Sequence, residues 1–147
     1  MSFTDSPKLS EKRINHYFEL AKNASTSSDF KQHKLGCVLV YRGKVIAEES
    51  NTTRTNPKQK EYNRLRGFAY ETPNNGQTHA ELGCLLKTKY MTDVDWSKVS
   101  LFVYREHKNG VRGLAKPCPA CRKAIIDRGI KRVYYTTEDS QVFERIE

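Results

Sequence analysis

The chain has 147 residues, of which 26 are Lys or Arg and 17 are Asp or Glu, giving a formal net charge of +9. No stretch reaches the roughly 20 apolar residues of a membrane span, and the N-terminus lacks the apolar core of a secretion signal. We therefore expect no membrane partner and a cytoplasmic, reducing compartment, where a cysteine pair is not a lasting disulfide. The positive charge favours polyanionic partners such as nucleotides or nucleic acid.

The first third of the chain predicts a helix followed by a β-hairpin. Ser6 and Pro7 have the residue types of an N-cap and a first helical position. An apolar stripe with helical spacing follows, formed by Ile14, Tyr17, Phe18 and Ala21. Residues 35–41 and 45–50 have the composition of strands, and Arg42-Gly43-Lys44 between them predicts the turn.

The remaining elements alternate between helix and strand. We expect a helix from Thr78 to about Tyr90, a strand at 99–104 and a helix from Pro117 to Gly129. A strand at 131–137 follows, and 142–146 is predicted to return as an antiparallel strand. A strand-helix-strand unit implies parallel strands, so the expected fold is a three-layer α/β/α domain with a mixed five-stranded sheet. In such sheets, ligand sites lie where helices begin after the carboxyl ends of strands.

Cys118 and Cys121 stand one helical turn apart at the start of the last predicted helix. This pair is typical of a redox site, a structural zinc site or a catalytic zinc site. The long loop between the third strand and Cys118, with no thioredoxin-like aromatic before the pair, disfavours the redox alternative. His79, at the start of the other internal helix, would complete three zinc ligands and leave one tetrahedral position for water.

Two further residues, Glu81 and Cys84, bear on whether a zinc site here would be catalytic or structural. Glu81 could accept a proton from a zinc-bound water, but Thr78-x-x-Glu81 is equally a capping box that only starts a helix. Cys84 is the obvious fourth ligand for a structural site, yet its position in the helix rotates it away from His79. Cys37 and Cys84 both stand among apolar residues and are predicted to be core thiols.

His79-Ala80-Glu81 followed by Pro117-Cys118-Pro119-Ala120-Cys121 resembles the HxE … PCxxC signature of the zinc-dependent cytidine and deoxycytidylate deaminase superfamily. The resemblance covers roughly residues 8–138 and includes the order of motifs and elements. It implies a cytidine deaminase-like catalytic domain over residues 1–147. Residues 52–77 would be a long basic insertion, or lid.

The resemblance also implies roles for individual residues. His79, Cys118 and Cys121 would bind one Zn²⁺ per chain together with a water or hydroxide. Glu81 would transfer a proton from this water to the base and then to the leaving amine. Ala80 would contact the base through its backbone, and Asn51 would hold the sugar, although Asn51 could instead be an ordinary turn residue.

The insertion carries five basic residues that could contact a phosphate or a nucleic-acid backbone: Arg54, Lys58, Lys60, Arg64 and Arg66. Its aromatic residues, Tyr62, Phe68 and Tyr70, suit base stacking, but they could equally anchor the segment to the sheet. A solvated surface without a partner is the alternative for the whole segment.

The resemblance implies hydrolysis of cytosine to uracil in a nucleoside or nucleotide, with release of ammonia and deoxycytidylate as the leading substrate. The subfamily signals are mixed, because His79 is typical of deoxycytidylate and polynucleotide deaminases, whereas the short antiparallel ending is typical of nucleoside deaminases. A deaminase of single-stranded DNA or RNA and an inactive zinc-stabilised nucleic-acid-binding module are the alternatives. Homo-oligomers are common in the superfamily and are expected as a further possibility here.

Overall fold

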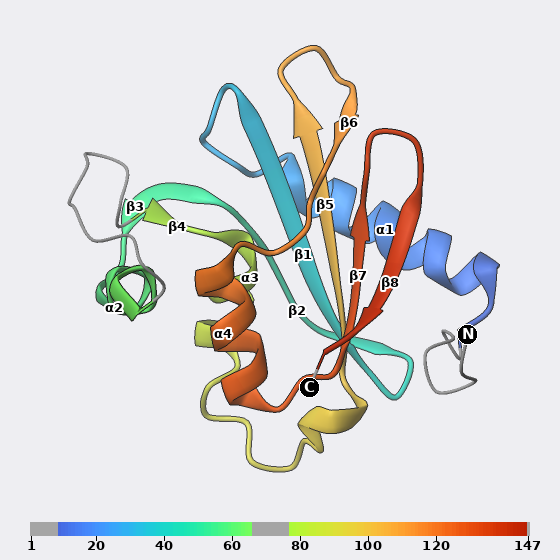
Figure 1. Ribbon diagram of the computed structural model, residues 1–147. Helices are drawn as coiled ribbons and strands as arrows, with labels where there is room; N and C mark the ends of the chain where they lie inside the picture. The colour runs from blue at the N-terminus through green and yellow to red at the C-terminus, as the bar shows by residue number, and fades with distance from the viewer. Residues whose placement is uncertain (1–8, 66–76, 147) are drawn as a thin grey trace.

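The computed structural model describes residues 9–65 and 77–146 and is built around a mixed β-sheet (Figure 1). The strands of the sheet are β1 (His33–Tyr41), β2 (Lys44–Ser50), β5 (Ser100–His107), β7 (Arg132–Thr136) and β8 (Gln141–Arg145). They lie in the order β2-β1-β5-β7-β8, and the short β6 (Arg112–Gly113) pairs with β5 beside this path. β5 and β7 are parallel, and the other pairs are antiparallel. The predicted mixed five-stranded sheet is confirmed.

Helices cover both faces of this sheet. The helix α1 (Glu11–Ser25) lies on one face, while α3 (Ala80–Lys87) and α4 (Pro119–Arg128) lie on the other (Figure 1). The helix α2 (Pro57–Leu65) packs against α4, and a short 3₁₀ turn, Trp96–Lys98, precedes β5. The three-layer α/β/α architecture is therefore confirmed. None of the helices within 9–65 and 77–146 has the length and apolar character needed to cross a membrane.

Two apolar clusters sit on opposite faces of the sheet because successive side chains of a strand point to opposite sides. On β5, Leu101 and Val103 pack beneath α3 and α4, whereas Phe102 packs toward α1. The Phe102 ring stacks on Tyr134 of β7 with centroids 4.3 Å apart, and Phe18 of α1 meets it edge-on at 5.3 Å. This alternation decides which side chains of each strand can reach the end of the sheet where α3 and α4 begin.

The β1–β2 hairpin closes through a two-residue turn. Arg42 and Gly43 have φ values of 52° and 76°, as in the turns that match the twist of a hairpin. Lys44 belongs to β2 and pairs with Tyr41, so the turn is one residue shorter than the predicted Arg42-Gly43-Lys44.

Several predicted boundaries differ from the structure. Ser6 and Pro7 lie outside the described residues, and α1 begins at Glu11 with Ser10 as its N-cap, whose hydroxyl accepts from the Arg13 N–H. The segment predicted as a long basic insertion contains the helix α2. It also contains a small two-stranded sheet of β3 (Thr52–Thr55) and β4 (Gln77–Thr78).

The helix α3 is shorter than predicted at both ends. Thr78 pairs with Thr52 in the small sheet and donates its hydroxyl to the Arg54 carbonyl, so the helix starts two residues later, at Ala80, with His79 as N-cap. At the other end, the Thr88 hydroxyl donates to the carbonyls of Cys84 and Leu85, and the helix ends at Lys87.

Gly36 sets the distance between α1 and β1. A Cβ atom at this position would lie 1.9 Å from the Ala21 carbonyl oxygen and 2.6 Å from the Ser25 nitrogen, both of them backbone atoms of α1. We expect Gly36→Ala to lower the free energy of unfolding by about 3 kcal/mol, because the helix must move away from the sheet. Denaturant unfolding followed by circular dichroism measures this change.

Gly43→Ala is the matched control. A Cβ at Gly43 meets nothing within 4 Å, so only the positive φ of 76° opposes the substitution, at about 1 kcal/mol. Equal losses of stability in the two variants would contradict a close helix–sheet contact at Gly36.

Candidate metal centre and pocket

The N-termini of α3 and α4 bring three metal-ligating side chains together. His79 is the N-cap of α3 and Cys118 is the N-cap of α4, and Cys121 lies in the first turn of α4. The Nδ1 atom of His79 lies 3.2 Å from the Cys121 sulfur and 3.6 Å from the Cys118 sulfur. The three ligand atoms all lie within 4.8 Å of one another.

These distances fit a tetrahedral zinc ion. With Zn–S near 2.3 Å and Zn–N near 2.0 Å, tetrahedral ligands lie roughly 3.5 to 3.8 Å apart. One imidazole and two thiol groups are also the donor types that zinc prefers. The three residues can therefore hold a zinc ion with one coordination position left for a non-protein ligand.

The cluster's own electrostatics favour a cation. A hydrogen bond from Cys121, followed by one from His79, lowers the pKa of Cys118 to about 4 although burial opposes this shift. The hydrogen bond with Cys118, together with burial, raises the pKa of Cys121. Burial works against the charged form of His79, but the hydrogen bond with Cys118 and the charge of Glu81 raise the pKa of His79. The Cys118 sulfur is therefore a thiolate at neutral pH.

Cys84 is not part of this cluster. It is fully buried, and its thiol donates to the Cys37 carbonyl oxygen at 3.3 Å. Burial also raises the pKa of Cys37, as expected for a core thiol. Both predicted core thiols are confirmed, and the structural four-ligand site with Cys84 finds no support within the described residues.

Glu81 has no structural partner in the described part of the chain. Glu81 is only 3% exposed, and its Oε1 atom is buried and accepts no hydrogen bond from the described residues. Because His79 rather than Thr78 caps α3, Glu81 does not take part in the capping box that the sequence allows. Burial raises the pKa of Glu81, while the charge of His79 opposes this shift. A buried carboxyl group with a raised pKa beside a pocket is a candidate for proton exchange with a ligand.

A pocket of about 340 Å³ opens onto the cluster. Its wall includes the predicted residues His79, Glu81, Cys118 and Asn51. Its other lining residues carry no motif that marks them in the sequence: Phe30, His33, Leu35, Gln77, Arg105 and Lys116. Two of these, Arg105 and Lys116, are basic residues outside the insertion. Their signal in the sequence is weak, because each is one of many basic residues in the chain.

A family model described as "Cytidine and deoxycytidylate deaminase zinc-binding region" matches residues 11–137. The chain belongs to this family. It is a zinc-dependent hydrolytic deaminase, and His79, Cys118 and Cys121 are the residues that can bind the zinc of this family. The resemblance seen in the HxE … PCxxC motif is confirmed.

Solved structures agree with this assignment. The dCMP deaminase of the cyanophage S-TIM5 in its apo form is 26% identical, with a TM-score of 0.61, over 90% of this chain and 88% of that chain. The same enzyme in complex with dCMP and dUMP is also 26% identical, with a TM-score of 0.59, over 86% and 82% of the two chains.

Cytidine deaminase from Burkholderia pseudomallei shares the fold at 19% identity, with a TM-score of 0.64 over 93% of each chain. A search of the curated proteins found no match. The family model and the 26%-identical dCMP deaminase support a deaminase of the cytosine type in general.

The two predicted substrate contacts, Ala80 and Asn51, lie in different surroundings. Ala80 is fully buried at the first position of α3, directly between His79 and Glu81. The Asn51 Oδ1 atom accepts from the Ser28 hydroxyl at 2.5 Å and from the Leu35 N–H at 2.9 Å. Its Nδ2 atom donates to the His33 carbonyl at 3.1 Å, which leaves one of its two N–H groups for another acceptor.

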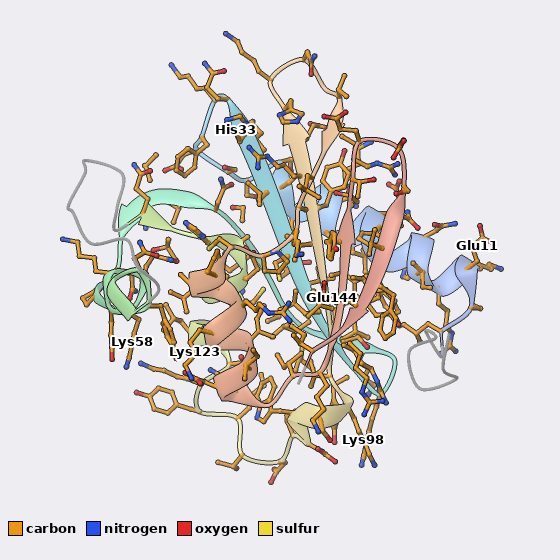
Figure 2. All side chains as sticks on the ribbon, in the orientation of Figure 1. Glu11, His33, Lys58, Lys98, Lys123 and Glu144 are labelled. Atoms are coloured by element: carbon orange, nitrogen blue, oxygen red, sulfur yellow. The ribbon has the colours of Figure 1, made fainter. Side chains whose placement is uncertain are left out.

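The described basic residues of the insertion do not line this pocket. Arg54 is exposed on β3, and Lys58 of α2 forms an exposed ion pair with Glu61 at 3.2 Å. Figure 2 shows Lys58 on α2, well away from His33 at the start of β1. Lys60 is half-buried on α2. Arg66, Phe68, Tyr70 and the side chain of Arg64 lie outside what the structure describes.

Tyr62 anchors the insertion to the deaminase core. Its hydroxyl donates to Asp127 Oδ2 of α4 at 3.1 Å, and its ring packs against the core beneath α3 and α4. Of the two alternatives for this aromatic residue, the structure shows anchoring.

Gln59 of α2 connects the insertion directly to the metal site. It is fully buried, its Oε1 atom accepts from the His79 backbone N–H at 3.1 Å, and its Nε2 atom donates to Asn63 at 3.0 Å. No local signal in the sequence marks this residue, because its role depends on α2 packing against α4 and so bringing Gln59 to the start of α3. Gln59 thus positions the backbone of a metal ligand.

We expect Gln59→Ala to weaken zinc binding about 10-fold, because residues that orient a metal ligand typically contribute 10- to 100-fold to affinity. Competition with a chromogenic zinc chelator measures the affinity. Lys58→Ala, an exposed change on the same helix, is the matched control and should leave the affinity unchanged. If both variants bind zinc as tightly as the unmodified chain, Gln59 does not position His79.

Proposed function

We propose that this deaminase converts cytosine to uracil in a free nucleoside or nucleotide, of the dCMP or cytidine type, with release of ammonia. The observation that carries the proposal is the buried, unpaired carboxylate oxygen of Glu81 beside the metal ligands in a pocket. A buried polar atom without a partner is destabilising, so its presence at a pocket is consistent with a partner supplied by the ligand. The 26% identity to a dCMP deaminase supports the cytosine preference.

In this proposal, each chain holds one zinc ion through His79, Cys118 and Cys121. Bound there, zinc would lower the pKa of a coordinated water toward about 7 and so supply a nucleophile at neutral pH. Glu81 accepts a proton from the attacking water and delivers it to the ring nitrogen next to the amino-bearing carbon. After the C–O bond has formed, Glu81 transfers a proton to the departing amine. This second proton comes from the hydroxyl that the water has become on the ring carbon. The C–N bond then breaks, and the products are the uracil-containing nucleoside or nucleotide and ammonia, so that one water is consumed for each base.

Other residues would orient the substrate. Ala80, at the first position of α3, offers its backbone to the base between the two functional side chains. The N–H of Asn51 Nδ2 that is not used by His33 would donate to the sugar. Contacts between the basic insertion and the substrate, a cytoplasmic location and a homo-oligomeric state stay predictions from the sequence.

A substrate panel tests the proposal. The zinc-loaded chain is incubated with dCMP, cytidine and a cytosine-containing single-stranded oligonucleotide, and loss of cytosine absorbance is followed together with ammonia release. Turnover of either monomer, with none of the oligonucleotide, is the expected result. Turnover of the oligonucleotide alone would instead identify a polynucleotide deaminase, and binding of it without any turnover an inactive module.

Substitution of the proton carrier gives a second test. We expect Glu81→Gln to lower kcat at least about a thousandfold, because the amide cannot carry the proton but has nearly the same shape. Zinc content and the unfolding transition should stay close to those of the unmodified chain. A Glu81→Gln variant with near-normal turnover would leave the carboxylate without a role in the reaction.

A further inference from the structure

Arg105 carries a positive charge into the wall of the same pocket. On β5, Leu101 and Val103 face α3 and α4, and Arg105 is the next side chain on that face. At this point the strand has passed the buried core, and Arg105 lines the pocket together with His79 and Glu81. Because successive side chains of β5 alternate between the two faces, the guanidinium group of Arg105 lies at the site.

The bonding of Arg105 is incomplete. Its Nε atom is buried and makes no hydrogen bond with any described residue. Its Nη1 atom meets the Leu114 carbonyl at 3.5 Å, a long contact, and none of the carboxylates described in the structure forms an ion pair with it. Within the described residues, two buried side-chain atoms lack a partner, Glu81 Oε1 and Arg105 Nε, and both belong to this one pocket.

A second cation extends this wall. Lys116 lines the pocket, is about half exposed, and lies 4.0 Å from Glu144, a carboxylate that is shared with Arg122. Glu81 is the one acidic residue among the residues that line the pocket. Arg105 and Lys116 therefore leave the remaining wall positive.

We propose that Arg105, assisted by Lys116, binds the phosphate of a cytosine mononucleotide and makes this enzyme select nucleoside monophosphates over nucleosides. The inference rests on the proposed cytosine deamination, since the base must reach Glu81 and the metal ligands. A nucleoside carries no anionic group for Arg105, whereas a guanidinium and a phosphate form paired, charge-assisted hydrogen bonds.

The size of the pocket favours a single nucleotide. Its volume of about 340 Å³ is near the lower end of the range for small-molecule sites, about 300 to 1,000 Å³. The phosphate-binding role thereby moves from the insertion, where the sequence predicts it, to the carboxyl end of β5.

The test compares dCMP with deoxycytidine in steady-state kinetics. We expect Arg105→Gln to lower the ratio of the two kcat/KM values about 10- to 100-fold, mainly through a higher KM for dCMP, as expected for a lost charge-assisted hydrogen bond. Arg105→Lys should recover part of the ratio because it restores the charge. Lys108→Gln removes an exposed charge just beyond the same strand, outside the pocket, and is the matched control with an unchanged ratio.

A binding measurement makes the test independent of turnover. Calorimetric titration of the zinc-loaded chain with dUMP and with deoxyuridine should show preference for dUMP, and Arg105→Gln should lose this preference. If Arg105→Gln does not fold, the comparison is made with Arg105→Lys, whose preference should be reduced.

Each contrary outcome has its own meaning. An unmodified chain that prefers deoxycytidine or an oligonucleotide over dCMP overturns the phosphate subsite while cytosine deamination stands. An equal effect of Arg105→Gln on nucleotide and nucleoside also overturns it, because a purely structural role would act on both. If no cytosine substrate is turned over, the proposed function fails, and the dUMP titration alone decides the subsite.

Discussion

The site depends on two helices that begin at the same edge of one sheet. His79 and Cys118 are both N-cap residues, so the positions where α3 and α4 start are also the positions of two metal ligands. The exposed N–H groups of a helix start favour negative charge, which stabilises a thiolate at Cys118 before any metal is bound. At Cys118, helix capping and metal binding thus use the same atom, because the sulfur accepts a hydrogen bond from the Cys121 N–H.

The sheet holds these two helix starts in register. β5 and β7 are parallel and α4 connects them, so α4 must begin at the carboxyl end of β5. β1 pairs antiparallel with β5 and brings Leu35 opposite Arg105, at the edge where the pocket forms. The insertion stabilises this arrangement from outside, through Gln59 at the His79 backbone and Tyr62 at α4.

The pocket combines two buried groups that a stable protein core would not keep. A carboxylate oxygen and a guanidinium nitrogen without partners each lower the stability of the fold. Their placement in one cavity, one beside the metal ligands and the other in a positive wall, is the pattern of groups reserved for a ligand. The apolar clusters on both faces of the sheet stabilise the fold and so offset the cost of these two unpaired groups. One of the clusters contains the Phe102–Tyr134 stack.

The sequence by itself determined the order of the main-sheet strands and of α1, α3 and α4, the mixed sheet and the three candidate metal ligands. These features follow from local signals: strand-like composition, helix starts, and cysteines spaced one helical turn apart. Glu81 stayed ambiguous in the sequence, because a capping box and a proton carrier have the same residue types. The tertiary structure removes the capping box, because Thr78 pairs with Thr52 in the small sheet and His79 becomes the N-cap.

Gln59 and Arg105 were invisible in the sequence for a related reason. Each is a polar residue in a polar or basic neighbourhood. The role of Gln59 arises only where α2 reaches the start of α3, and that of Arg105 only where β5 runs past the core. Local patterns determine which elements form, but contacts between residues distant in the chain determine which polar side chains become buried at the site.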